Sequence, residues 1–200
     1  MSWPRSVCLA RWPKADGQVF EDWRKQNLFR QIHREGFSEY GKGYYYVLTD
    51  ITRFYEFIRH DTLMIYLRAR INDQNVLGII HSFLEAEWLD NGSPIPRHKH
   101  KGILTGLPQA PALSAFLANL YLNELDNWLE GRAVDFVRYV DDLAILCESE
   151  NAAKAIIIDL QEYIKQQFGL EISKDPQKTK GPFPAADTTE ICDWIRGPPG

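Results

Sequence analysis

Cysteine is scarce in this 200-residue chain: Cys8, Cys147 and Cys192 are scattered, and no CxxC spacing occurs. An odd number of isolated thiols argues against a disulfide framework or a zinc site and is typical of a reducing compartment. The sequence also lacks a signal peptide, a long apolar run, internal repeats and low-complexity tracts. The default expectation is therefore a cytoplasmic protein with no membrane-spanning segment.

Positive charge is not in excess either. Lys and Arg number 23 against 27 Asp and Glu, which gives a formal net charge of −4. Bulk electrostatics alone therefore do not indicate a nucleic-acid-binding protein. Hydrophobic residues make up 44% of the chain, with six Trp, nine Tyr and ten Phe. A chain of this length and composition can bury one sizeable core and is not disordered.

The most informative stretch is V-D-F-V-R-Y-V-D-D-L-A-I-L-C, residues 134–147. Apolar, β-prone residues on both sides of Asp141 and Asp142 predict a β-hairpin with the acidic pair at its turn. Two carboxylates in an apolar setting are costly to bury unless a cation compensates them. Oxygen-only ligation favours Mg²⁺ or Mn²⁺ over zinc. For an isolated Asp-Asp pair, a solvated surface turn would be the alternative.

Hydrophobic periodicity predicts both strands and helices around this hairpin. The strand Y-Y-Y-V-L-T-D, residues 44–50, ends in Asp50, at the kind of strand end that commonly presents chemistry. Helices are expected from 51 to about 67, over 72–90, over 112–130, and over 151–168, the last capped by Gly169. A basic strand at 97–101 and a Gly- and Pro-containing loop at 102–109 stand between the second and third of these helices. A short strand and basic turn at 169–180 and a strand in E-I-C-D-W-I, residues 190–195, follow the last helix.

Taken in this order, four motifs resemble the palm of a reverse transcriptase, over about residues 44–196. V-L-T-D-I-T-R-F-Y resembles the first palm motif, and G-L-P-Q-A-P-A-L-S with A-N-L-Y-L-N-E-L-D resembles the second. F-V-R-Y-V-D-D-L resembles the Y-x-D-D hairpin, and G-L-E-I-S-K-D-P-Q-K-T-K resembles the lysine motif that follows it. The chain is similar to bacterial enzymes of the group II intron, retron and defence-associated groups, with the last as the nearest.

The resemblance implies an α+β fold: a palm-type antiparallel sheet with packed helices. Residues 1–43 would be part of the fingers, and residues 44–196 would be the palm, with fingers helices embedded at 60–100. Residues 197–200 would be a truncated tail, and E-I-C-D-W-I stands where a primer-grip hairpin would follow. No thumb is evident, so we expect a missing thumb or accessory domain.

The implied activity is that of an RNA-directed DNA polymerase, which copies an RNA template from a DNA or RNA primer using dNTPs. Its chemistry is two-metal nucleotidyl transfer. Asp50 and Asp141 would bridge two Mg²⁺ ions, with Mn²⁺ as the alternative. Asp142 would have a smaller role, and Ile51 is included among the metal-binding residues. Lys178 would lie near the leaving phosphate as a candidate proton donor, ahead of Lys180.

The resemblance also implies a nucleotide pocket. Tyr55 would be the steric gate that excludes a 2′-hydroxyl, and Gln109 and Ala110 would contact the nucleotide and template. The alternative is a core position for Tyr55, with Phe54 facing the nucleotide.

Two departures from the family pattern bear on function. Ala110 stands where the family usually has Gly, and Val19 and Phe20 follow Gln18 where intron-type enzymes usually place Arg. Three hypotheses therefore stay open: an RNA-directed DNA polymerase with a role in anti-phage defence, a template- or primer-independent DNA polymerase of the same fold, and a non-catalytic palm that binds nucleic acid or protein. We favour the first.

Overall fold

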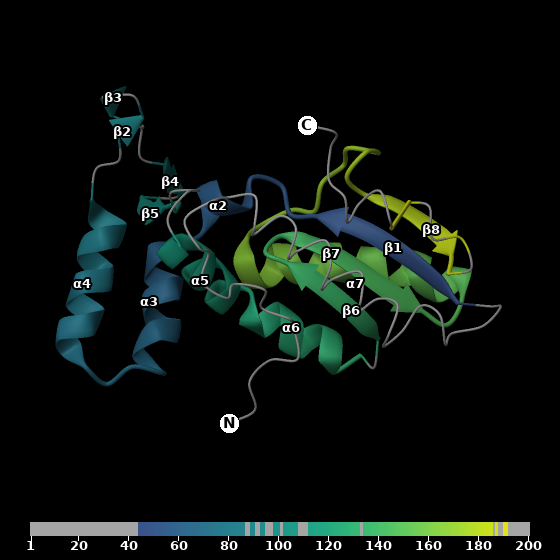
Figure 1. Cartoon of the computed structure of the whole chain (residues 1–200), viewed down its shortest axis with the longest axis horizontal. Helices are drawn as coiled ribbons and strands as arrows, with labels where there is room; N and C mark the ends of the chain where they lie inside the picture. Colours follow the sequence, from purple (N-terminus) through teal and green to yellow (C-terminus); the bar gives the residue numbers. More distant parts are fainter. Residues whose placement is uncertain are drawn as a thin grey trace. The chain divides into compact units, whose positions relative to one another are not determined.

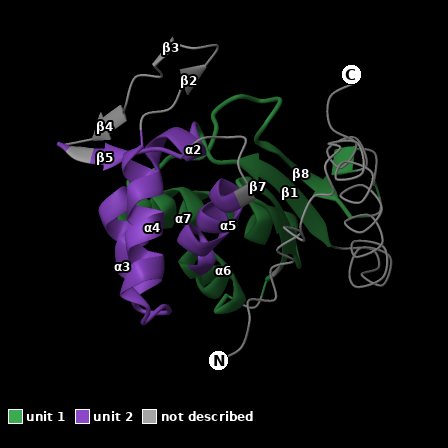
Figure 2. Ribbon diagram, turned by 60° about the vertical axis from the view of Figure 1, so that its left-hand side comes forward, with its two compact units in different colours: residues 1–52, 124–200 green, residues 53–123 purple. Residues whose placement is uncertain are grey.

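The structure, a computed structural model, describes residues 44–86, 89–90, 93–94, 98–100, 102–107, 112–132, 134–185, 187 and 190–191 (Figure 1). The chain divides into two compact units (Figure 2). The second unit is residues 53–123, and the first unit is made by the residues on either side, 1–52 and 124–200. The segment expected to belong to the fingers, residues 1–43, lies outside the described residues. Within the described part, no helix is both long and apolar enough to cross a bilayer.

The first unit is built on a four-stranded antiparallel sheet. Its strands, in spatial order, are β6 (Asp135–Tyr139), β7 (Asp142–Cys147), β1 (Tyr45–Asp50) and β8 (Lys180–Pro184). The predicted strand at 44–50 and the predicted acidic hairpin are confirmed as β1 and the β6–β7 pair. Strand β8 was not predicted, because its sequence K-G-P-F-P carries two prolines, which are rare inside strands.

The register of β1 and β7 separates the two faces of this sheet. Asp50 lies opposite Asp142 and Leu48 lies opposite Ala144, and side chains alternate along a strand, so these residues share one face. Tyr46 and Leu146 extend the same face as a buried apolar cluster, and we call it the acid face. The opposite face is the helix face, because α7 (Glu150–Phe168) contacts β1, β7 and β8 there (Figure 1).

Helix α7 follows directly from its sequence. The Ser149 side chain caps its start by accepting from the backbone N–H of Ala152 at 3.1 Å, and Gly169, with φ of 69°, ends it. Its buried residues recur at helical spacing: Ala153, Ile156, Leu160, Ile164 and Phe168. The predicted helix over 151–168 and its glycine cap are confirmed.

The predicted helix over 112–130 is divided into α5 (Ala112–Tyr121) and α6 (Asn123–Glu130), and the boundary between the two units falls at this break. In the first unit, α6 packs against α7. The rings of Trp128 and Tyr163 stack at 4.5 Å, and the Tyr163 hydroxyl donates to the Glu124 carbonyl at 3.1 Å. These contacts attach α6 to the helix layer of the sheet.

The second unit contains α2 (Phe54–Phe57), α3 (His60–Arg68), α4 (Gln74–Glu85) and α5, together with the two short strand pairs β2–β3 (Leu89–Asp90, Ser93–Pro94) and β4–β5 (His98–His100, Ile103–Thr105). The expectation of one helix from 51 to 67 was wrong, because the chain is extended at Ile58 and Arg59. There the Ile58 carbonyl accepts from the Gly106 N–H at 2.9 Å, and Arg59 pairs with Thr105. Pairing with the β5 segment replaces the helical bonds.

Two further expectations need correction. Helix α4 begins after its Asp73 cap and stops at Glu85, well before residue 90, and Leu89 and Asp90 belong to β2. The expected strand over 190–195 was wrong at its first two residues, since Glu190 and Ile191 are helical; the rest of that segment lies outside the described residues. Both errors come from short segments, in which periodicity does not separate strand from helix.

Candidate active site

The site lies where β1 ends beside the loop of the acidic hairpin. Asp50 is the last residue of β1 and lies opposite Asp142, the first residue of β7. Just beyond the strand, the Ile51 N–H donates to the Asp141 carbonyl at 3.3 Å. Backbone pairing therefore sets Asp50 beside Asp141 and opposite Asp142 at this end of the sheet. The structure thus brings together two acids that are far apart in the sequence.

This concentration of negative charge changes the acidity of Asp141. Burial, followed by the negative charges of Asp142 and Asp50, raises the pKa of Asp141 from 3.8 to about 7. At neutral pH the cluster therefore binds a proton readily, and a cation can take the place of that proton. Perturbed carboxylates of this kind are typical of sites that perform chemistry.

Lys178 provides a positive charge beside these acids. Its Nζ lies 2.8 Å from Asp50 Oδ2, and its side chain is 56% exposed whereas that of Asp50 is 9% exposed. The hydrogen bond to Asp50 raises the pKa of Lys178, with smaller contributions from the charges of Asp141 and Asp142. The lysine is therefore protonated at neutral pH.

The turn that carries Lys178 is anchored to the end of β1. The Ser173 N–H donates to the Asp50 carbonyl at 2.7 Å, and the hydroxyls of Thr179 and Thr49 lie 3.0 Å apart. Lys180, the less favoured candidate for the same role, instead pairs with Glu190 at 3.0 Å. Of the two lysines, Lys178 is the one that contacts the acid cluster.

The residues at this end of the sheet offer oxygen donors of the kind that a divalent metal ion requires. Among the described residues, no three His, Cys, Asp or Glu side chains are arranged to hold a metal ion. Backbone pairing nevertheless sets Asp50 opposite Asp142 and beside Asp141. Ile51 is fully buried and apolar, so it has only its backbone carbonyl to offer. A set made of carboxylate and carbonyl oxygens fits Mg²⁺ or Mn²⁺ in chemistry.

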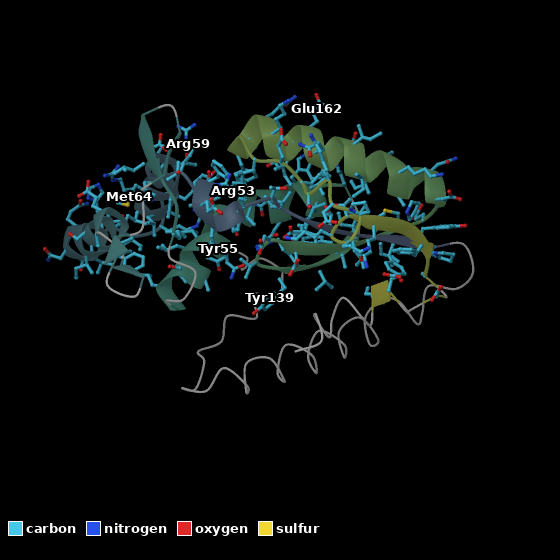
Figure 3. The ribbon with its side chains drawn as sticks, turned by 90° about the horizontal axis from the view of Figure 1, so that it is seen from above. Arg53, Tyr55, Arg59, Met64, Tyr139 and Glu162 are labelled. Carbon is cyan, nitrogen blue, oxygen red and sulfur yellow. The ribbon has the colours of Figure 1, made fainter. Side chains whose placement is uncertain are left out.

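The residues expected to form the nucleotide pocket belong to the second unit. Tyr55 is half-buried on α2 (Figure 3). Phe54 is 1% exposed, and its ring packs against those of Tyr55 and Tyr121 at 5.7 and 6.3 Å. Gln109 and Ala110 lie outside the described residues. Of the two aromatic residues, Tyr55 has the more accessible side chain.

The loop that leads to Gln109 is attached to the helix that carries Tyr55. The Leu107 N–H donates to the Tyr55 carbonyl at 2.8 Å, and the His60 ring hydrogen-bonds the Gly106 carbonyl at 2.7 Å. Gly106 has φ of 103°, and a Cβ there would come within 3.3 Å of the Glu56 carbonyl oxygen, so this close approach requires glycine. Gly106 and Leu107 are therefore joined to the Tyr55 segment within the second unit.

A buried ion pair behind the hairpin was not predicted from the sequence. Arg138 of β6 donates from Nε and Nη2 to the two carboxylate oxygens of Asp126 of α6, at 2.7 and 2.6 Å. Strand alternation was the available signal: it puts Arg138 on the same face as Phe136, among residues that a helix layer covers. A buried arginine almost always has an acidic partner.

An antiparallel sheet with an acidic hairpin at one end, and with helices on one face, is the α+β fold of a polymerase palm. Residues 16–182 match the family model described as reverse transcriptase (RNA-dependent DNA polymerase). The chain belongs to the reverse transcriptase family.

Similar proteins support the same family. The chain is 35% identical over 208 residues to the group II intron-encoded protein LtrA of Lactococcus lactis subsp. cremoris, a match that covers 89% of this chain and 34% of LtrA. It is 20% identical over 193 residues to the putative COX1/OXI3 intron 2 protein of Saccharomyces cerevisiae, covering 68% of this chain and 22% of that protein. The chain therefore spans about a third or less of these relatives.

A solved structure shows the same fold at much lower sequence identity. Apo telomerase of Candida tropicalis matches with a TM-score of 0.51 at 13% identity, covering 88% of this chain and 33% of the telomerase chain. At this identity the likeness concerns the fold alone.

Proposed function

We propose that the chain forms the catalytic core of an RNA-directed DNA polymerase, which adds deoxynucleotides to a primer 3′-hydroxyl opposite an RNA template. The observation that carries this proposal is that Asp50, at the end of β1, lies opposite Asp142 and beside Asp141 of the acidic hairpin. Membership of the reverse transcriptase family supports the reaction class. The match to an intron-encoded protein favours the group II intron branch of the expectation, and a role in anti-phage defence stays a prediction.

Two Mg²⁺ or Mn²⁺ ions would be held by Asp50 and Asp141, with Asp142 and the Ile51 carbonyl as further oxygen donors. Divalent ions in such a site lower the pKa of a hydroxyl nucleophile and stabilise charge on phosphoryl and leaving oxygens. The chain itself keeps the two carboxylates together through the pairing of β1 with β7. Because the pairing is continuous up to the acids, the site is built on rigid strands.

Lys178 is the proposed proton donor to the leaving pyrophosphate. Its contact with Asp50 keeps the ammonium group protonated, which a general acid requires before it can donate. Its side chain is long and more than half exposed, so it can exchange Asp50 for a phosphate oxygen without moving the anchored turn.

In this proposal, residues 44–196 are the palm, with fingers helices embedded at 60–100, and residues 1–43 belong to the fingers. Tyr55 is the steric gate, and Gln109 and Ala110 contact the nucleotide and template. RNA template, primer and dNTPs are the partners. Since phosphate contacts supply most of the affinity for nucleic acid, template binding should weaken steeply with salt.

The test is primer extension by the full-length protein, with an RNA template, a DNA primer, dNTPs and Mg²⁺. Parallel reactions omit the template or the primer, and Asp141→Asn serves as the matched inactive variant. Template-dependent extension is the expected result. Extension without template or primer would favour the second hypothesis, and no incorporation with either Mg²⁺ or Mn²⁺ would favour a binding module.

The gate is tested separately with Tyr55→Val. If the phenol ring excludes a 2′-hydroxyl by collision, its removal should raise the ratio of rNTP to dNTP incorporation, since discrimination rests on a repulsive contact. Tyr66→Val, in α3 of the same unit, is the control for loss of a tyrosine. An unchanged ratio in a well-folded Tyr55→Val protein would rule out the gate.

A further inference from the structure

The acidic hairpin turns through a backbone conformation that its residue type disfavours. Tyr139 at the end of β6 (Figure 3) pairs with Asp142, so Val140 and Asp141 form a two-residue loop. Val140 has φ of 57°. Such loops favour Gly or Asn where φ is positive, and a β-branched residue there is a true outlier. Strain of this kind persists only where the surrounding structure holds it, and it concentrates at functional sites.

Arg138 supplies the interaction that holds this turn. Its Nη1 donates to the Val140 carbonyl oxygen at 2.7 Å. That carbonyl belongs to the peptide that joins Val140 to Asp141, so the bond restrains the backbone directly before the proposed metal ligand. On the other side, the Asp141 carbonyl accepts from the Ile51 N–H at 3.3 Å. Both peptides that flank Asp141 are therefore held, one by Arg138 and the other by the chain just beyond β1.

Arg138 is itself held in place by Asp126. The two residues are 3% and 1% exposed, and the guanidinium meets the carboxylate through the two hydrogen bonds described above. A buried ion pair adds little net stability compared with well-packed apolar residues of similar volume. A role in positioning therefore explains this pair better than a gain in stability does.

We propose that Arg138 and Asp126 are positioning residues, which hold the strained turn through the Val140 carbonyl and so direct the Asp141 carboxylate toward Asp50. The inference rests on the proposed function, because the direction of Asp141 matters for catalysis only if Asp141 takes part in it. Neither residue touches reacting atoms. A displacement of about 1 Å in a catalytic constellation costs roughly 100-fold in rate.

The test is a double-mutant cycle in the full-length protein, with Arg138→Lys, Val140→Gly and their combination. Lysine keeps the positive charge but lacks the planar fork that reaches Asp126 and Val140 together. Glycine adopts positive φ without strain, so the turn no longer needs the restraint. The single-turnover rate, the KM for dNTP and the hydrogen exchange of the amides of residues 139–142 are measured for each protein.

We expect Arg138→Lys to lower the rate by roughly 10- to 100-fold and to speed hairpin exchange. The KM for dNTP should change by less than about threefold, because binding of the ground state is not the step affected. In the Val140→Gly background, Arg138→Lys should lower the rate by less than about threefold. Such non-additivity of the two substitutions shows that both residues act on the same turn. An equal loss in both backgrounds would overturn the proposal.

Arg132→Lys is the matched control. Arg132 is an exposed arginine of the same unit that stacks over Trp128 at 3.5 Å and lies 4.0 Å from Asp159. Its replacement should leave the rate and the hairpin exchange unchanged. A loss as large as that of Arg138→Lys would contradict the proposal, because it would show that any arginine in this unit matters equally.

A purely stabilising role predicts a different pattern. All rates are measured at a temperature where each variant is folded, with and without an osmolyte that strengthens burial and raises Tm. If the osmolyte restores the rate of Arg138→Lys while Val140→Gly does not, the pair serves stability alone and the proposal fails. If Arg138→Lys does not fold, Asp126→Asn replaces it in the cycle with the same expectation. Loss of the fold by both variants in both backgrounds also counts against the proposal.

The exchange measurement separates this inference from the proposed function. If the parent protein incorporates no nucleotide under any condition, the proposed function fails. Hairpin exchange still decides whether Arg138 holds the turn. Exchange that Arg138→Lys leaves unchanged would overturn the positioning role even in an active polymerase.

Discussion

The hairpin carries two charge arrangements that differ in burial and in how their charges are compensated: one is a fully buried ion pair, and the other is a partly buried cluster of acids. On the helix face, the side chains of Arg138 and Asp126 are 2% and 1% exposed and neutralise each other. At the hairpin loop, the acids crowd together, and the pKa of Asp141 is raised to about 7. Lys178, more than half exposed, meets only one of them, Asp50, through a hydrogen bond.

The difference separates charge that supports structure from charge that supports chemistry. A buried charge without a partner costs several kcal/mol, so a structural charge is kept only with its hydrogen bonds complete. At the loop, burial and the neighbouring charges of Asp142 and Asp50 raise the pKa of Asp141, and a divalent cation would offset this repulsion. The clustered acids at the loop therefore lower the stability of the fold, whereas the Arg138–Asp126 pair on the other face has its hydrogen bonds complete. Such a local loss of stability is common at active sites.

The largest effect is expected when one of the clustered carboxylates is neutralised. Asp141→Asn keeps the volume but removes a ligand charge, and we expect the single-turnover rate to fall by at least roughly 1000-fold. In EDTA at pH 8 the same change should raise the free energy of unfolding by about 1–2 kcal/mol, because the repulsion from Asp50 and Asp142 is relieved. Asp159→Asn, at a 54% exposed side chain, is the control and should do neither. Loss of stability in Asp141→Asn would contradict this interpretation of the cluster.

The second-largest effect is expected when the Arg138–Asp126 ion pair is broken. Arg138→Met leaves Asp126 buried without a partner and should lower the free energy of unfolding by about 3–5 kcal/mol. Combining it with Asp126→Leu should return stability to within about 1 kcal/mol of the parent. The rate should stay low in the double variant, since the Val140 carbonyl still lacks its donor. Denaturant unfolding and single-turnover assays on the same preparations make the comparison, and full recovery of the rate would count against the positioning role.

The third effect is a pH dependence of stability in EDTA. Asp141 has a folded pKa of about 7 against an ordinary value of 3.8, so the folded state binds more protons between these pH values. Its contribution therefore favours folding at low pH and is lost as the pH rises through about 7. We expect the parent to lose about 1–2 kcal/mol more than Asp141→Asn between pH 5 and pH 8. Parallel pH profiles for the two proteins would contradict the raised pKa.

The smallest effect concerns the exposed cation. Lys178→Met should change the free energy of unfolding by less than about 1 kcal/mol, because an ion pair with an exposed partner is weak. Incorporation should nevertheless slow by roughly 10- to 100-fold if Lys178 acts on the leaving phosphate. Lys174→Met, at an 85% exposed lysine of the same turn, is the control for lost positive charge. Equal rates for the two variants would remove Lys178 from the proposed chemistry.

Some parts of the fold were predictable because local sequence decides them. Strand β1, the acidic hairpin and α7 with its Gly169 cap each carry their own alternation, helical period or cap, and all three predictions are confirmed. The breaks near Ile58 and Leu122 were missed, because both lie inside continuous apolar periodicity. At Ile58 the deciding hydrogen bond comes from Gly106, a partner that periodicity does not reveal.

The candidate site divides in the same way. The sequence by itself determined the family resemblance and the identity of the acids, since motif order and residue type are local properties. Only the tertiary structure decided that Lys178 rather than Lys180 meets Asp50, and that Arg138 reaches Asp126 and the Val140 carbonyl. These contacts join residues on different elements, and their energies depend on burial and on hydrogen-bond geometry that arise once the sheet and its helices have packed.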